Sequence, residues 1–259
     1  MEARDHKYFH SDIVHNLASP SEIVPFIMQL INPSSVADVG CGTGTFLKVF
    51  KEHGVKKVLG IDGPLVNRDK MHIDISEFIE ADLEKPLKIN GFFDLILCLE
   101  VAEHLSADSA DTLVSSLVSL GKIICFSAAV TMQGGQNHIN EQPISYWQKK
   151  FRNYKYQFFD VFRNEFWDNE IIDWWYKQNM FLIVHESINV SDIIAYRQLH
   201  GDAKLHIHPD LLRLHIQQKE NALLKIQYLK NNLHRIKSGE EIWKLYGSIL
   251  LKKIRKVFK

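Results

Sequence analysis

Short apolar runs alternate with segments of helical spacing along most of this chain. The runs are bounded by glycine or acidic residues, and they occur at 36–39, 57–62, 78–83, 92–99, 122–130 and 180–186. Residues 92–99, "FFDLILCL", lack the polar alternation of a half-exposed strand, which is typical of a parallel strand covered on both faces. Segments of helical periodicity lie between the runs, at 46–50, 106–120, 144–151 and 169–178. Strands that alternate with helices predict an α/β fold with a doubly wound parallel sheet.

The pattern changes near the end of the chain. From about Ile188 it becomes helical, so we expect an α/β domain over 1–190 and a helical extension over 191–259. From Lys219 onward there are eleven basic and three acidic residues, so this tail carries about +8 and the rest about −8. Its segments 223–236 and 242–259 pair apolar with basic faces. A homo-oligomer interface fits this pattern first, then a helix docked on the domain, then contact with an anionic membrane surface.

The overall composition narrows the class of protein. Of the 259 residues, 46% are apolar, which is ample for a core, and 31 basic residues balance 31 acidic ones. This balance argues against a generic nucleic-acid binder. The N-terminus is too charged for a signal peptide and no apolar run reaches the length of a membrane span, so we expect a cytoplasmic protein. Three cysteines without metal-knuckle spacing predict reduced thiols.

Candidate ligand-binding features lie where the predicted strands end. Asp38 begins the glycine-rich stretch "DVGCGTG" over 38–44, and Asp62 and Asp82 close the next two apolar runs. Glycines let a ligand approach the backbone closely, and such loops often bind nucleotides. A plain tight turn is the alternative, since the stretch lacks the spacing of dinucleotide-binding and phosphate-binding loops. Asp62 is placed to accept ribose hydroxyls, and an adenine would fit beside Asp82 and Leu83.

Taken in this order, the motifs resemble those of the class I S-adenosylmethionine-dependent methyltransferases over roughly residues 20 to 186. The resemblance implies a Rossmann-like, doubly wound, seven-stranded sheet and S-adenosyl-L-methionine as the cofactor. It places the glycine loop at the methionine and ribose portions, Asp38 at the methionine end and Asp62 at the ribose. The cofactor-binding residues expected in this way are Asp38, Gly40, Cys41, Gly42, Gly44, Asp62, Gly63, Asp82, Leu83 and Glu100.

The fourth apolar run leads into a charged motif, "CLEVAEHL", over 98–105. On a helix, positions i, i+3 and i+4 share a face, so Glu100, Glu103 and His104 would converge if a helical turn began at the strand end. His138 follows the next strand and would reach the same rim of the sheet. These four residues form a candidate metal site, of which Glu103, His104 and His138 are also the candidate catalytic residues. Glu141 and Gln142, on the same loop as His138, would orient that histidine, contact a substrate or cap a helix.

This Glu-x-x-Glu-His pattern with a downstream histidine resembles the metal site of the small-RNA 3′-terminal 2′-O-methyltransferases. More loosely, it is similar to that of ubiquinone-biosynthesis O-methyltransferases. The resemblance puts Mg²⁺ first as the metal, whereas the ligand types also suit Mn, Fe or Zn. Coordination would lower the pKa of an acceptor hydroxyl, and a histidine would take its proton. Two alternatives stay open, a metal-free site with His104 as the base and a purely structural role.

The string "FSAAVTMQGGQNHINEQPISYW" over 126–147 resembles a set of bacterial methyltransferases met in surface-glycan and secondary-metabolite settings. We therefore expect an enzyme that moves a methyl group from S-adenosylmethionine to a hydroxyl of a small polar or saccharide acceptor, assisted by a divalent metal. Two other functions fit the same residues. One is metal-free methylation with His104 or His138 as the base. The other is a non-catalytic cofactor-binding scaffold whose tail assembles a larger complex.

Overall fold

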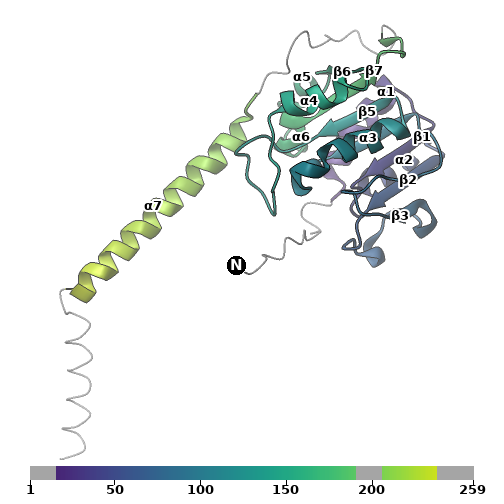
Figure 1. Ribbon diagram of the computed structural model, residues 1–259. Helices are drawn as coiled ribbons and strands as arrows, with labels where there is room; N and C mark the ends of the chain where they lie inside the picture. Colours follow the sequence, from purple (N-terminus) through teal and green to yellow (C-terminus); the bar gives the residue numbers. More distant parts are fainter. Residues whose placement is uncertain (1–15, 191–205, 238–259) are drawn as a thin grey trace, which may run out of the picture. The chain divides into compact units, whose positions relative to one another are not determined.

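The computed structural model describes residues 16–190 and 206–237 of the chain. Its central element is a seven-stranded sheet with the strand order β3-β2-β1-β4-β5-β7-β6 (Figure 1). The chain divides into two units, residues 1–208, which contain the sheet, and residues from Pro209 onward. The expected α/β fold, a doubly wound seven-stranded sheet with a helical C-terminal extension, is confirmed.

The strands run parallel except at one edge of the sheet. Their bounds are β1 (Ser35–Val39), β2 (Lys57–Asp62), β3 (Phe78–Glu80), β4 (Leu95–Leu99), β5 (Ile123–Ser127), β6 (Tyr156–Phe159) and β7 (Phe181–His185). β1 pairs in parallel with both β2 and β4, so the carboxyl ends of these three strands meet at one rim. β7 pairs antiparallel with β5 and β6, so the expectation of an entirely parallel sheet is wrong at this edge.

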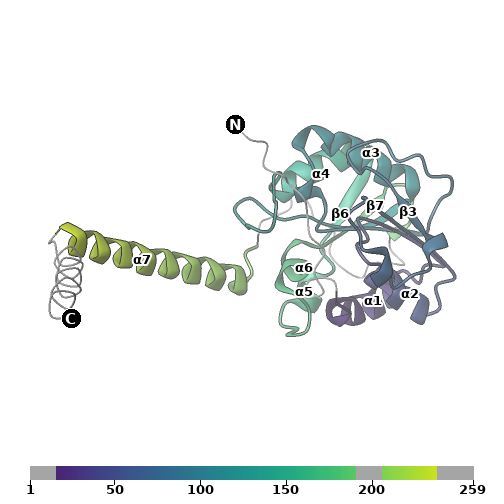
Figure 2. The same ribbon diagram turned by 90° about the horizontal axis from the view of Figure 1, so that it is seen from below.

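Helices cover both faces of the sheet (Figure 2). One face carries α1 (Ala18–Leu30), α2 (Thr45–Glu52), α5 (Arg163–Phe166) and α6 (Trp174–Asn179), and the other carries α3 (Ala110–Leu120) and α4 (Ile144–Arg152). The central strand β4 contributes to both cores. Leu95, Leu97 and Leu99 pack in the cluster under α1 and α2, whereas Ile96 and Cys98 pack under α3 and α4. Burial on both faces explains why this strand has no polar alternation.

Several observed elements differ from the expected ones. β3 ends at Glu80 rather than continuing to residue 83, since the chain turns away after the amide of Ala81 donates to the carbonyl of Asp62 at 2.8 Å. β6 lies in the aromatic stretch after α4, where no strand was expected, because its sequence "YQFF" lacks clear alternation. α6 begins only at Trp174, because the side chain of Asn169 accepts the amides that follow it in a turn.

The second unit contains α7 (Pro209–Lys237), which confirms helical structure in this part of the tail. Residues 186–189 form a turn and a bend instead of the helix expected from about Ile188. None of the described helices is both long and apolar enough to cross a lipid bilayer. The expected domain boundary at 190/191 adjoins residues 191–205, which lie outside the described ranges, as do residues 238–259 with their predicted amphipathic segment. The oligomer and membrane interpretations of the tail stay predictions.

Candidate functional site

The loop between β1 and α2 presents backbone to the rim of the sheet. Gly40, Gly42 and Gly44 have positive φ values of 85°, 52° and 80°, a conformation that residues with a Cβ rarely adopt. A Cβ on Gly40 would lie 2.2 Å from Cγ2 of Val101, so only glycine fits against the segment that follows β4. A ligand can therefore approach this backbone closely.

Asp62, at the end of β2, holds the glycine loop in place. Its carboxylate accepts hydrogen bonds from the amides of Gly42 at 2.7 Å and Gly63 at 2.6 Å. The neighbouring carbonyl of Ile61 accepts the amide of Gly40 at 2.7 Å. These bonds bring the loop and the acid together at one rim, as the sequence predicts for a ribose-binding acid beside a glycine loop.

Asp38, at the end of β1, is a buried acid at the same rim, only 4% exposed. Within the described residues, no donor forms a hydrogen bond with its carboxylate. Burial, and secondarily the negative charge of Asp62, raises the pKa of Asp38 from 3.8 to about 7. A cation beside this carboxylate would restore its ionised form.

The raised pKa of Asp38 makes stability depend on pH. Between pH 3.8 and about 7 the folded protein holds a proton on Asp38 that the unfolded chain has released. The free energy of unfolding of the ligand-free protein should therefore fall as pH rises through this window, relative to that of Asp38→Asn. We expect the difference between the two proteins to change by about 3 kcal/mol from pH 4.5 to pH 7.5. Urea unfolding at several pH values measures it, and a constant difference would contradict the burial argument.

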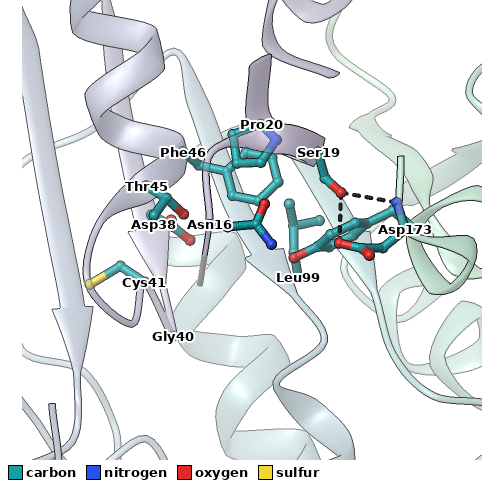
Figure 3. A pocket seen from close by; sticks show the side chains of 11 residues that line it. Asn16, Ser19, Pro20, Asp38, Gly40, Cys41, Thr45, Phe46, Leu99 and Asp173 are labelled. Carbon is teal, nitrogen blue, oxygen red and sulfur yellow. Dashed lines mark hydrogen bonds between the residues drawn. The ribbon is translucent and has the colours of Figure 1, made fainter. Parts of the chain in front are cut away.

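A pocket opens between the glycine loop and the first turns of α1 and α6 (Figure 3). Asp38, Gly40 and Cys41 line it from the loop side, and Ser19 and Asp173 line it from the helices. Figure 3 shows that Ser19 and Asp173 are joined by two hydrogen bonds. The pocket thus combines the predicted cofactor loop with two helices that are distant from it in sequence.

The third acid of the expected cofactor site has a different setting. Asp82 is exposed, and its carboxylate contacts Nζ of Lys85 at 3.0 Å and the amide of Glu84 at 3.1 Å. The hydrogen bond from Lys85 is the main cause that lowers the pKa of Asp82. The adjacent Leu83 is buried. The structure therefore places an apolar side chain, Leu83, next to an acid whose negative charge is paired with Lys85, on the β3 side of the rim.

A second group of side chains gathers beyond the ends of β4 and β5. One ligand atom from each of Glu103, His104 and His138 lies within 4.8 Å of the others. Glu103 and His104 belong to a short 3₁₀ turn, Ala102–His104, whereas His138 arrives on the long loop after β5. The His104 and His138 rings pack edge to face, with centroids 4.9 Å apart. The three side chains form a compact carboxylate and imidazole cluster of the kind that binds divalent metals.

Backbone hydrogen bonds hold the two segments of this cluster together. The carbonyl of Glu103 accepts the amides of Ile139 at 2.9 Å and Asn140 at 3.0 Å. The side-chain amide of Asn140, which is buried, donates to the carbonyl of Ala102 at 3.3 Å. The loop after His138 is therefore anchored to the turn that carries Glu103.

The Glu103 carboxylate is completely buried, and neither oxygen has a hydrogen-bond partner within the described residues. Burial is the main cause that raises its pKa well above 4.5, and the negative charge of Glu100 adds to it. The nearby backbone amides of Glu103 and Ala129 lower this pKa in part, while contact with the Glu100 side chain raises it further. A buried carboxylate in this state gains strongly from a cation as partner.

His138 is oriented by a carboxylate. Its Nδ1 lies 2.9 Å from Oε1 of Glu141, and the same oxygen accepts the amide of Gly134 at 2.6 Å. With Nδ1 engaged, Nε2 is the nitrogen left for a ligand. The backbone of Gly135 lies against the ring, since a Cβ there would come within 2.3 Å of Nε2 and Cε1 of His138.

Glu100 does not join the three-residue cluster. It has a positive φ of 54°, so the helical turn expected at the end of β4 does not form there. Its carboxylate accepts the side-chain amides of Asn179, at 3.2 and 3.3 Å, and of Gln133, at 3.4 Å. Burial raises the pKa of Glu100, although hydrogen bonds with the side chains of Asn179, Ser127 and Glu103 lower it in part. Of the four predicted metal ligands, the structure brings Glu103, His104 and His138 together, whereas Glu100 bonds to buried amides and also contacts the Glu103 carboxylate.

Several residues of the site have no counterpart in the sequence reasoning. These residues, which were assigned no role from sequence, lie on three separate segments, and they are Ser19, Gln133, Asp173 and Asn179. The fold brings Ser19 and Asp173 to the pocket lined by Asp38. It brings Gln133 and Asn179 to the carboxylate of Glu100. No local sequence signal identifies them.

Comparisons with known proteins identify the family of the chain. The family described as "Methyltransferase domain" matches residues 13–186. The small RNA 2′-O-methyltransferases of Mus musculus and Rattus norvegicus are each 31% identical over 107 residues, covering 32% of this chain and 26% of each relative. The chain thus aligns with about a quarter of the length of these relatives.

Solved structures of methyltransferases are also similar to the chain. The methyltransferase domain of bacterial-CtHen1-C has a TM-score of 0.49 at 17% identity, covering 66% of this chain and 99% of that one. The magnesium protoporphyrin IX methyltransferase of Synechocystis has a TM-score of 0.49 at 16% identity, covering 70% of this chain and 91% of that one. With its glycine loop, its acids at the strand ends and residues 13–186 matched, the chain belongs to the methyltransferase-domain family, the class I S-adenosylmethionine-dependent methyltransferases.

Proposed function

We propose that this methyltransferase transfers the methyl group of S-adenosylmethionine to a hydroxyl of a small polar or saccharide acceptor. We further propose that a divalent cation held by Glu103, His104 and His138 assists the transfer. The observation that carries the proposal is the buried Glu103 carboxylate, which has two imidazoles beside it and no hydrogen-bond partner in the described residues. A buried charge of this kind is costly unless it has a partner or binds a metal.

The donor would lie along the rim from β3 to β4. Asp62, whose carboxylate oxygens each carry two lone pairs, would accept the ribose hydroxyls. Leu83 would pack against the adenine, and the backbone at Gly40 would contact the methionine portion. In the transfer, the acceptor oxygen bonds to the methyl carbon as the carbon–sulfur bond breaks. The residues of the rim contribute by holding donor and acceptor in line.

The residues of the cluster fit a divalent cation by their chemistry. Two imidazoles and one carboxylate favour Mn²⁺, Fe²⁺ or Zn²⁺ over Mg²⁺, which prefers oxygen ligands. We therefore propose this order in place of the Mg²⁺ suggested by the sequence resemblance. A bound divalent cation would lower the pKa of a coordinated hydroxyl. Glu141 would keep the Nδ1 proton on His138 and so leave Nε2 as the donor atom.

The acceptor would present neighbouring oxygens to such a site. Saccharides carry adjacent hydroxyls, and this is the chemical reason for placing them first. The local identity to the small RNA 2′-O-methyltransferases favours a second candidate, the terminal ribose of an RNA, which offers the same pair of hydroxyls. The balanced charge of the chain, 31 basic against 31 acidic residues, is the argument against RNA.

Removal of metal tests the proposal directly. We expect treatment with a chelator to reduce methyl transfer by at least about tenfold, and addition of Mn²⁺ to restore it. Methylation would be followed as formation of S-adenosylhomocysteine, with pools of nucleosides, mono- and oligosaccharides and short RNAs as acceptors. Periodate-oxidised RNA, which lacks the terminal vicinal hydroxyls, is the matched control for the RNA candidate.

The outcomes separate the candidate functions. Full turnover without metal removes the cation and leaves a metal-free methyltransferase with His104 or His138 as the base. Binding of S-adenosylhomocysteine without transfer to any acceptor favours the cofactor-binding scaffold. Transfer to intact RNA but to no saccharide replaces the first acceptor class with the second.

A further inference from the structure

The donor pocket is lined by one buried acid, one partly buried acid and no base. Asp38 and Asp173 both line it, and no lysine, arginine or histidine is among its described lining residues. Burial raises the pKa of Asp173, as it does that of Asp38, while Ser19 and Lys177 offset part of the effect at Asp173. Acids in this setting favour a ligand that brings a positive charge.

Asp173 is held at the pocket by a reciprocal pair of hydrogen bonds. The hydroxyl of Ser19 donates to Oδ2 of Asp173 at 2.8 Å, and the amide of Asp173 donates to the hydroxyl of Ser19 at 2.9 Å. Ser19 is buried in the first turn of α1, and Asp173 immediately precedes α6. The two bonds therefore join two helices across 154 residues of sequence, directly at the pocket (Figure 3).

The strand order predicts which end of the donor reaches this pocket. The adenine and ribose contacts proposed above lie at β3 and β2, while the pocket lies at the ends of β1 and β4, lined by Asp38 and Leu99. Because β3, β2, β1 and β4 are successive neighbours in the sheet, a donor laid along the rim brings its amino-acid end to the pocket. This end carries an α-ammonium group, the positive charge that the two acids favour.

We propose that Asp173, positioned by Ser19, binds the α-ammonium group of S-adenosylmethionine opposite the glycine loop. This inference rests on the proposed donor site and adds a binding residue outside the glycine loop and the strand-end acids. The hydroxyl of Thr45, at the same pocket, would be a donor for the α-carboxylate, whereas the Ser19 hydroxyl already donates to Asp173. The ion pair with the ammonium would be made in a partly buried setting, and hydrogen bonds between charged groups are stronger than neutral ones.

Two ligands without a sulfonium charge test the assignment. S-adenosylhomocysteine carries the amino-acid end, whereas 5′-methylthioadenosine lacks it and keeps the adenosine and the sulfur. By calorimetry with the full chain, Asp173→Asn should weaken S-adenosylhomocysteine by at least about tenfold and leave 5′-methylthioadenosine within about twofold of the wild type. The amide oxygen that replaces the carboxylate would still accept the Ser19 hydroxyl, so the link between α1 and α6 is retained. Ser19→Ala should weaken S-adenosylhomocysteine by a smaller factor, about threefold to fivefold, because it only loosens Asp173.

The matched control is Asp168→Asn, an exposed acid on the same segment, which should change neither affinity. An equal loss for both ligands in Asp173→Asn would overturn the assignment and show a structural role. Unchanged affinity for S-adenosylhomocysteine would overturn it as well. Absence of any S-adenosylhomocysteine binding by the wild type would instead remove the proposed donor site, and the inference with it.

Discussion

Glu103→Gln is expected to lower turnover by at least about a hundredfold without loss of stability. The lower bound follows from residues that only orient metal ligands, whose loss already costs tenfold to a hundredfold. Glutamine keeps the size and shape of the buried side chain but has no charge for a cation. It therefore removes a ligand while it leaves the packing around the completely buried position intact.

The stability of this variant gives an independent readout. Burial raises the pKa of Glu103 well above 4.5. Above pH 4.5 the unfolded chain releases this proton while the folded protein keeps it, so the free energy of unfolding falls as the pH rises. Wild-type stability from this group is full at low pH and is lost as pH rises toward the folded pKa. In chelator, Glu103→Gln should therefore be more stable than the wild type at pH 8, by on the order of 2 kcal/mol, and the gain should shrink toward pH 5.

Thermal unfolding with and without Mn²⁺ measures the stability of each protein and its response to the cation. Wild-type protein should be stabilised by Mn²⁺ in proportion to occupancy, whereas Glu103→Gln should not respond. Glu165→Gln, an exposed acid of α5, is the matched control and should behave as the wild type. Retention of both the Mn²⁺ response and the turnover by Glu103→Gln would sink the assignment of this carboxylate as a ligand.

The rim of the sheet was predictable from sequence because its features are local. The glycine loop, Asp62 and the strand ends follow from apolar runs closed by glycine or acid, and each run became a strand at or near the expected residues. The strand β6 was missed, since four largely aromatic residues after a helix carry no period that separates strand from loop. The antiparallel direction of β7 has no sequence signal of its own, because an apolar run reads the same in either direction.

The failure at Glu100 has a physical cause. Spacing of i, i+3 and i+4 predicts a shared face only if the first residue is helical, but the amide of Glu100 donates to the carbonyl and hydroxyl oxygens of Ser127, at 3.1 and 3.0 Å. These bonds extend the pairing of β4 with β5 by one residue, and the chain then turns at Glu100 with a positive φ instead of entering a helical turn. A long-range contact thus overrides the local helical pattern. The partners of Glu100, Asn179 and Gln133, come from other elements for the same reason.

Gly135→Ala is expected to reduce turnover by about tenfold to a hundredfold with little change in stability. A methyl group at this position would come within 2.3 Å of the His138 imidazole, which is too close for any real contact. The ring must move away, and this movement disturbs its contact to Glu141 and its place beside Glu103 and His104. The Mn²⁺ needed for half-maximal activity should rise as well, and titration of activity against Mn²⁺ measures both changes.

Gly134→Ala supplies the matched control, since a methyl group at Gly134 strains the backbone without a clash, whereas one at Gly135 clashes with His138. Gly134 has a positive φ of 73° and open space around its Cβ position, so alanine there strains the backbone by about 1 kcal/mol but touches no side chain. Stability should fall slightly in Gly134→Ala, and turnover should fall in Gly135→Ala. If Gly135→Ala acts through the ring, it should have no further effect in a protein that already carries His138→Ala. An additional loss in the double variant would show that Gly135 acts by another route, such as movement of the whole loop after β5.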